Sequence, residues 1–100
     1  MPGRSLDNRL ISPYYSSVIA VRLSPEAEAD IKRLPTQMKY RLDDVLARLE
    51  SWPQVSGVKW LKHEWTGHAR IRMGDWRVIF KVENDVLVVR IQHRSEVYEE

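Results

Sequence analysis

The most informative segment of this chain is Ala69-Arg-Ile-Arg-Met-Gly-Asp-Trp-Arg-Val-Ile-Phe-Lys-Val82. On both sides of Gly74-Asp75, apolar and basic side chains alternate with a period of two, which is typical of two half-buried strands joined by a tight turn. Glu83-Asn-Asp85 predicts a second turn, and the apolar segment 86–92 predicts a third strand. We therefore expect a three-strand antiparallel meander with short loops.

The part of the chain before this meander predicts one strand and two helices. Residues 18–23 are predicted as the strand. Ser24 suits the N-cap and Pro25 the first position of a helix that stops before Pro35. Thr36 is predicted to cap a second helix. The apolar stripe of that helix repeats every three or four residues and consists of Met38, Leu42, Val45, Leu46 and Leu49.

This order of elements predicts the fold class. An N-terminal strand, a two-helix antiparallel hairpin and then the meander make an α+β two-layer domain, in which the helices cover one face of an antiparallel sheet. Residues 55–68 are predicted to be a loop that crosses the sheet edge. We expect residues 1–17 to be an arm and residues 18–100 to be a single domain, because 100 residues suffice for one compact domain.

Composition excludes several classes of protein. The chain has no cysteine, so neither disulfides nor thiolate chemistry are expected, and three histidines alone make a structural zinc site unexpected. It has no apolar segment long enough to cross a membrane and no leader-like start. We expect a cytoplasmic protein that needs no metal, cofactor or membrane.

Charge is concentrated in the second half of the chain. Residues 59–94 carry eight Lys/Arg and four Asp/Glu, whereas residues 24–51 carry five and six. Such a basic region attracts polyanions, of which nucleic acid is the commonest. Alternation places Arg70, Arg72, Arg77 and Lys81 on one face of the sheet, joined by Arg90 and Gln92 if Leu87, Val89 and Ile91 point inward. Like charges in register repel each other, so we expect a phosphate guest; an ordinary solvated face is the alternative.

Other side chains have both a chemical and an ordinary interpretation. His93 suits acid–base chemistry near neutral pH, but an isolated histidine is more often a surface residue. Tyr98 is equally consistent with packing. Trp60 and Trp65, in the predicted loop, are either anchors of that loop or platforms on which bases stack.

Three segments, in this order, resemble the RelE/ParE superfamily of toxins. They are Leu23-Ser-Pro-Glu-Ala-Glu-Ala-Asp-Ile-Lys-Arg-Leu-Pro35, Ala69-Arg-Ile-Arg-Met-Gly-Asp-Trp-Arg-Val-Ile-Phe80 and His93-Arg-Ser-Glu-Val-Tyr98. The likeness covers about residues 18–98. It implies a small curved sheet backed by a helical hairpin, in agreement with the order of elements above.

For a RelE-like member, the resemblance implies metal-free cleavage of mRNA on the ribosome, in which the RNA's own 2′-hydroxyl attacks the adjacent phosphate. By position, Arg77 matches the arginine at the scissile phosphate and Tyr98 the tyrosine that transfers a proton. Arg70 and Arg72 match basic positions that are lysines in some members. Because arginine does not readily give up its proton, we expect these two to stabilise charge, and Tyr98 or His93 to transfer the proton. The residues expected to hold the RNA are Lys59, Lys62, Lys81, Arg90 and Arg94.

The resemblance also implies a cognate antitoxin whose extended tail covers the basic residues and the helices. Two other functions stay open at this point. ParE-like members of the same superfamily inhibit DNA gyrase and do not cut RNA, and a non-catalytic RNA-binding module would have the same fold.

Overall fold

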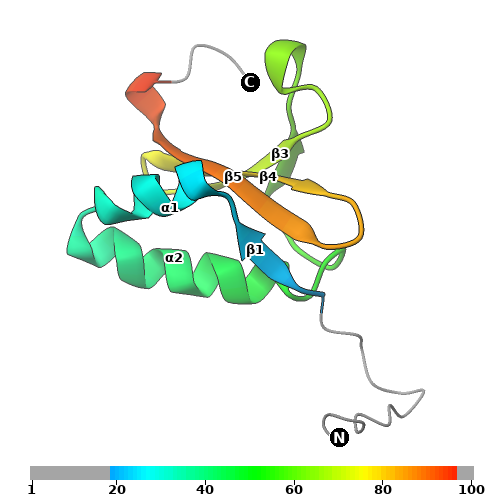
Figure 1. Cartoon of the computed structure of the whole chain (residues 1–100), viewed down its shortest axis with the longest axis horizontal. Coiled ribbons are helices and arrows are strands. Elements are labelled where there is room, and N and C mark those ends of the chain that lie inside the picture. The colour runs from blue at the N-terminus through cyan, green and yellow to red at the C-terminus, as the bar shows by residue number, and fades with distance from the viewer. Residues whose placement is uncertain (1–18, 97–100) are drawn as a thin grey trace, which may run out of the picture.

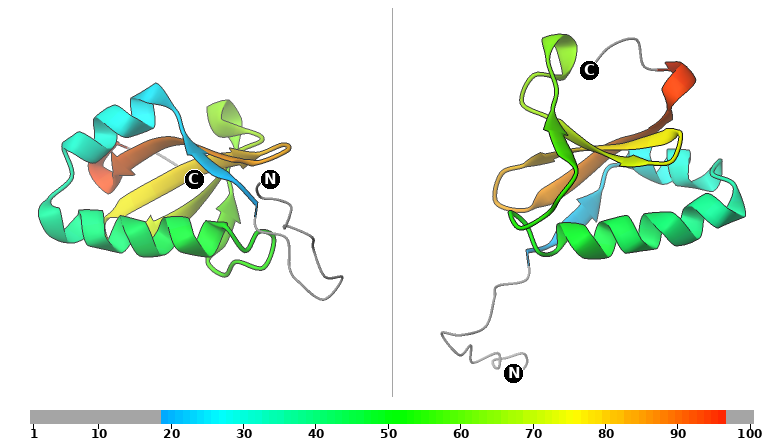
Figure 2. Two further views of the ribbon diagram at one scale, coloured as in Figure 1. Left: turned by 60° about the horizontal axis from the view of Figure 1, so that its bottom comes forward. Right: turned by 180° about the vertical axis from the view of Figure 1, so that it is seen from behind.

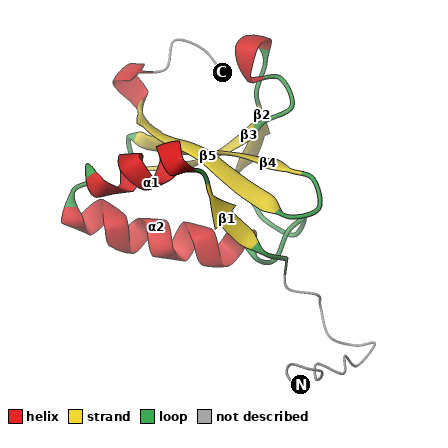
Figure 3. Ribbon diagram, in the orientation of Figure 1, coloured by secondary structure: helices red, strands yellow, loops and turns green. Residues whose placement is uncertain are grey.

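The computed structural model describes residues 19–96, and within them five strands form one sheet with the order β1-β5-β4-β3-β2. Helices α1 and α2 both cover one face of this sheet (Figures 1 and 3). Two short 3₁₀ helices, η1 and η2, project from the side of the sheet away from α1 and α2 (Figures 1 and 2). The predicted α+β class, with both helices on one face, is confirmed.

The first half of the chain follows the predicted order. Its elements are β1 (Val21–Leu23), α1 (Pro25–Lys32) and α2 (Thr36–Leu49). Ser24 caps α1 as predicted, because its hydroxyl oxygen accepts the N–H of Ala27 at 3.0 Å. The predicted cap of α2 is wrong: Pro35 occupies the N-cap position, and Thr36 is already the first helical residue.

The second half contains four strands and both 3₁₀ helices. They are β2 (Val58–Trp60), η1 (His63–Trp65), β3 (Ala69–Met73), β4 (Trp76–Val82), β5 (Val86–His93) and η2 (Arg94–Glu96). The predicted meander corresponds to β3, β4 and β5. The prediction of a loop throughout 55–68 is wrong, because β2 pairs with β3 as an edge strand that is too short for its alternation to be recognised. The sheet is also mixed, since β1 lies parallel to β5.

The core lies between the sheet and the helices, where the alternation of β3 and β4 predicts it. Its buried members are Ala27, Leu34, Leu42, Val45, Leu49, Ala69, Ile71, Met73, Val78, Phe80, Val86, Val88 and Ile91. The predicted alternation of β5 is wrong in its first half, where Val86 and Val88 are buried instead of Leu87 and Val89. A β-bulge opposite Ile79 and Phe80 inserts Val89 and exchanges the two faces of β5 beyond it.

Helix α1 covers the edge of β5 beyond the end of β1. The Ser24 hydroxyl donates to the carbonyl oxygen of Val89 at 2.9 Å. The Asp30 side chain is only 2% exposed, and its Oδ2 accepts the backbone N–H of Ile91 at 2.8 Å and the Nε–H of Arg90 at 2.7 Å. Side chains of a helix therefore satisfy backbone groups that a neighbouring strand would otherwise pair with.

Several predictions fall on residues that the structure does not describe. The arm of residues 1–17 and the C-terminal Tyr98 lie outside the described range 19–96, so the single domain over residues 18–100 stays a prediction. No helix in the described range is both long and apolar enough to cross a membrane. No group of three His, Cys, Asp or Glu within residues 19–96 is placed to hold a metal ion.

Candidate nucleic-acid interface

Five cationic side chains of β2, β3 and β4 share the face of the sheet away from α1 and α2. They are Lys59 of β2, Arg70 and Arg72 of β3, and Arg77 and Lys81 of β4. Lys59 lies directly opposite Arg70, and Arg72 directly opposite Arg77, and residues in such cross-strand pairs point to the same side. Lys81 joins them because it lies four residues beyond Arg77 on the same strand. We call these five residues the basic face.

The arginines of this face are close enough to influence one another's ionisation. Burial and then the charges of Arg72, Arg70 and Arg94 lower the pKa of the Arg77 guanidinium. Burial and then the charge of Arg72 lower the pKa of Arg70. Both directions are those expected when like charges crowd together. We call Arg70, Arg72, Arg77 and Arg94 the arginine cluster.

Backbone carbonyls on two sides hold the ends of this cluster. Arg70 is 9% exposed, and its Nη1 donates to the carbonyl oxygen of Gly57 at 3.3 Å. The backbone N–H of Arg94 donates to the carbonyl oxygen of Asp75 at 2.7 Å, and its guanidinium lies 3.7 Å from the Asp75 carboxylate. The β3–β4 turn therefore fixes the start of η2 beside Arg77. An anion placed here would meet several guanidinium groups at once.

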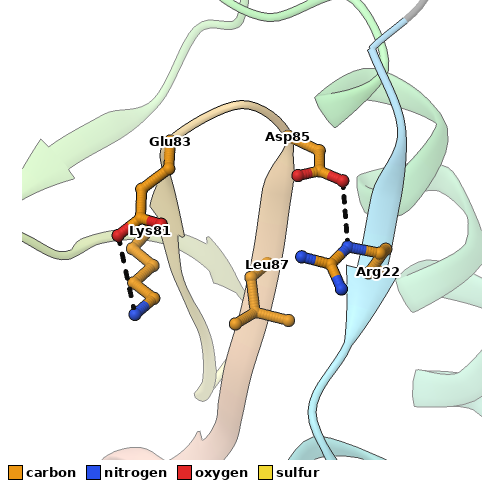
Figure 4. Close-up of a pocket in the computed structure, with 5 residues that line it drawn as sticks. All are labelled: Arg22, Lys81, Glu83, Asp85 and Leu87. Atoms are coloured by element: carbon orange, nitrogen blue, oxygen red, sulfur yellow. Dashed lines mark hydrogen bonds and ion pairs between the residues drawn. The ribbon is translucent and has the colours of Figure 1, made fainter.

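The opposite end of the same face is electrically balanced. A small pocket of about 90 Å³ lies here, lined by Arg22, Lys81, Glu83, Asp85 and Leu87 (Figure 4). Arg22 Nε lies 2.9 Å from Asp85 Oδ2, and Lys81 Nζ lies 3.9 Å from Glu83 Oε2. Lys81, which was predicted to hold RNA, thus lies on the predicted face but beside a carboxylate. The arginine cluster lies at the other end of the face, around Arg77.

Two further cations predicted to hold RNA lie outside the arginine cluster. Arg90 binds the buried Asp30, and this hydrogen bond raises the pKa of Arg90. Lys62 is exposed and precedes η1, on the opposite flank of the face from η2. Lys59 and Arg94, in contrast, lie beside members of the cluster.

His93 lies on the helix side of the sheet. It is the cross-strand partner of Trp76, whose side chain packs against the core, and the two rings meet edge to face with their centroids 5.1 Å apart. The Ser95 backbone N–H donates to His93 Nδ1 at 3.2 Å, so the neutral ring carries its proton on Nε2. Arg77 is paired with Gln92 instead, and points to the other side. The predicted catalytic residues Arg70, Arg72 and Arg77 are therefore brought together, and His93 is not among them.

Sequence reasoning missed the buried Asp30. The residue falls on the apolar stripe of α1, three residues after Ala27 and four before Leu34. A carboxylate at a core-facing helical position indicates a partner with the opposite charge. That periodicity was the available signal, although it does not identify Arg90, 60 residues away in the sequence, as the partner.

Comparison with known proteins agrees with this fold. The family model described as ParE toxin of type II toxin–antitoxin system, parDE, matches residues 21–98. The RelBE2 toxin–antitoxin complex from Mycobacterium tuberculosis contains a chain with 23% identity and a TM-score of 0.68, over 77% of this chain and 99% of that one. A search of curated protein sequences finds no match.

Two other solved structures have the same fold. The archaeal RelE–RelB complex from Pyrococcus horikoshii matches with 24% identity and a TM-score of 0.63, over 80% of this chain and 99% of the other. YafQ from Escherichia coli matches with 17% identity and a TM-score of 0.63, over 80% of this chain and 98% of the other. The family model spans most of the chain and these neighbours share its architecture, which confirms the resemblance found in the sequence. The chain belongs to the ParE toxin family, within the RelE/ParE superfamily of type II toxin–antitoxin systems.

Proposed function

We propose that this toxin is a ribosome-dependent endoribonuclease that cuts mRNA and thereby inhibits translation in the cytoplasm. The observation that carries the proposal is the arginine cluster, in which Arg70, Arg72 and Arg77 share one sheet face and burial and neighbouring charges lower the pKa of Arg77. Bringing like charges together costs free energy that an arriving phosphate recovers. Arginine also binds phosphate through two parallel N–H donors.

The cluster suits a reaction in which the RNA supplies its own nucleophile. The 2′-oxygen forms a bond to the adjacent phosphorus while the bond from phosphorus to the 5′-oxygen breaks, leaving a 2′,3′-cyclic phosphate and a 5′-hydroxyl. Negative charge grows on the phosphoryl oxygens in the transition state, where Arg77 and its neighbours stabilise it. One group must take the proton of the 2′-hydroxyl, and another must protonate the leaving oxygen.

Primer extension on mRNA during in vitro translation tests this proposal. We expect new cuts within translated codons, and 2′,3′-cyclic phosphate at the 3′ ends they create. Intact messages with continued translation would refute it.

We assign proton transfer to Tyr98, which matches the family's tyrosine by position. His93 is the weaker candidate, because its ring packs on Trp76 on the helix side of the sheet. We expect Tyr98→Phe to lower the cleavage rate by about 100-fold, the lower end for loss of a general acid or base. His93→Gln should change that rate by less than about threefold, because it removes no group from the face that holds Arg77. Single-turnover cleavage on programmed ribosomes measures both. A large loss in His93→Gln with little loss in Tyr98→Phe would reverse the assignment.

Gyrase inhibition is the second candidate, and the family model favours it, because its description names the ParE toxin of parDE. A supercoiling assay with purified DNA gyrase separates the two functions. Inhibition of supercoiling without any RNA product would select the ParE-like function.

We also propose a cognate antitoxin as partner, since two of the three structural neighbours described above were solved as toxin–antitoxin complexes. An acidic segment of that antitoxin would neutralise the arginine cluster. Its apolar residues would cover the groove of about 430 Å³ between α1 and α2, which is lined by Leu23, Ile31, Thr36, Lys39, Tyr40, Leu42, Asp43 and Leu46. Co-purification with the product of an adjacent gene, followed by loss of toxicity on co-expression, checks this pairing.

A further inference from the structure

We infer that Trp65, in the segment between β2 and β3, is a stacking platform for a nucleobase of the bound RNA. This inference rests on the proposed function, because it names a base-binding subsite beside the arginine cluster. Trp52 and Trp76 pack against the hydrophobic core, whereas Trp65 is half-buried in a surface segment and is not among the residues that pack there.

The segment around Trp65 is held by its own hydrogen bonds. The N–H of Leu61 donates to the carbonyl oxygen of His68 at 2.9 Å, which closes the segment at its base. The N–H of His68 donates to the carbonyl oxygen of Trp65 at 2.9 Å, and the hydroxyl of Thr66 donates to that of His63 at 2.7 Å. These bonds hold the backbone that carries Trp65 before any ligand arrives, which lowers the entropy that binding would cost.

The pairing of β2 with β3 places this segment on the side of the basic face. The register pairs Lys59 with Arg70 and Trp60 with Ala69, and the Leu61–His68 hydrogen bond continues it by one residue. His68 therefore shares the face of Arg70. The ring of Trp65 meets the ring of His68 edge to face, with 5.1 Å between centroids. η1, which carries Trp65, projects to the same side of the sheet (Figure 1).

The charges around Trp65 favour a nucleotide over other ligands. Residues 59–72 contain four Lys/Arg and a single acidic residue, Glu64. A flat aromatic ring beside a cationic surface matches the two parts of a nucleotide, since the base stacks on the ring and the phosphate binds the cations. Stacking tolerates any base, so this subsite positions the RNA strand and does not select a sequence. A side chain of the antitoxin is the alternative ligand of the Trp65 ring, and the experiment below distinguishes it from a nucleobase.

The test is cleavage of short synthetic mRNAs on programmed ribosomes by Trp65→Ala, Trp65→Phe and Trp60→Ala. Trp60 is the matched control, because it is 55% exposed and its partner Ala69 places it on the helix side of the sheet. We expect Trp65→Ala to lower kcat/KM by about 5- to 150-fold, the effect of losing one stacked base. Trp65→Phe should retain most of the activity, and Trp60→Ala all of it. Thermal melting of each variant checks folding.

A second arm uses mRNAs with one abasic nucleotide placed in turn on either side of the cut. At one of these positions, the abasic nucleotide should lower the kcat/KM of the wild type by the same factor as the Trp65→Ala substitution does on intact mRNA. The kcat/KM of Trp65→Ala itself should not fall further on that abasic mRNA. If Trp65→Ala cleaves as fast as the wild type while Arg77→Ala is inactive, the inference about Trp65 is overturned and the proposed function is not. Normal cleavage by Trp65→Ala with weakened antitoxin binding would assign the ring to the protein partner. Absence of cleavage by the wild type would overturn the proposed function and this inference with it.

Discussion

Replacing Arg77 by alanine is expected to slow cleavage of translated mRNA by about 100- to 1000-fold, the cost of removing one preorganised donor to developing negative charge. Arg77 is the member of the cluster whose pKa is lowered by burial and by three neighbouring arginines, Arg72, Arg70 and Arg94. Its guanidinium therefore lies in the combined field of these three arginines. Primer extension and single-turnover cleavage on programmed ribosomes measure the loss.

Two matched variants make this result interpretable. Arg77→Lys keeps the charge but loses the bidentate fork, so we expect an intermediate rate. Arg22→Ala removes an arginine from the balanced end of the same side of the sheet, where Arg22 binds Asp85, and should cleave within about threefold of wild type. Equal losses in Arg22→Ala and Arg77→Ala would mean that total charge matters and the position of Arg77 does not. Full activity of Arg77→Ala would contradict the catalytic assignment.

Replacing Asp30 by alanine is expected to lower the free energy of unfolding by about 2–3 kcal/mol at pH 7. Removing one partner of a buried ion pair costs about 3–5 kcal/mol, and the effect here is smaller because Arg90 is 31% exposed and can reach water. The variant leaves Arg90, Arg33 and the N–H of Ile91 without the carboxylate they share. Urea unfolding followed by tryptophan fluorescence measures the difference. Asp44→Ala, at an exposed position of α2, should change stability by less than about 0.5 kcal/mol.

The stabilisation by Asp30 depends on pH in a defined direction. Burial by itself would raise the pKa of Asp30, but hydrogen bonds from Arg90 and the Ile91 N–H, together with the charges of Arg90 and Arg33, outweigh it and lower the pKa below 3.8. A carboxyl with a lowered folded-state pKa contributes its full stability above the unfolded pKa and loses it as pH falls through the folded one. The difference between wild type and Asp30→Ala should therefore be constant from pH 5 to 7 and shrink below about pH 4. A difference that grows on acidification would contradict this account.

Much of the fold follows from local patterns in the sequence. The alternation in Ala69–Val82 correctly predicts two strands, their turn and the face that meets the helices, because the side of the sheet to which a residue points is set by its position along one strand. The bulge at Val89 was not predictable in this way, since it depends on the register between β4 and β5. The strand β2 escaped prediction because three residues show too little periodicity.

The candidate site was likewise predictable only where its residues lie in regular strands. Arg70, Arg72 and Arg77 lie in regular strands, and alternation brings them to one face as predicted. His93 was among the predicted catalytic residues but points away from the others, because it pairs with Trp76 on the helix side of the sheet. The carboxylate of Glu83 lies beside Lys81, and the carboxylate of Asp30 binds Arg90. The contact between Asp30 and Arg90 links distant parts of the chain. The Arg90–Asp30 pair joins residues 60 positions apart, so no short-range pattern in the sequence identifies it.

The edge of β5 has a consequence for self-association. Unpaired strand edges are where sheets of different molecules join and aggregate. Here Ser24 and Asp30 of the α1 segment occupy the carbonyl of Val89 and the N–H of Ile91, so an incoming strand finds both backbone groups already bonded. At the opposite edge of the sheet, β2 is three residues long and carries Lys59 at its centre, and short charged edges resist strand addition. The same helix that anchors Arg90 thus also keeps this small sheet from extending into a neighbouring molecule.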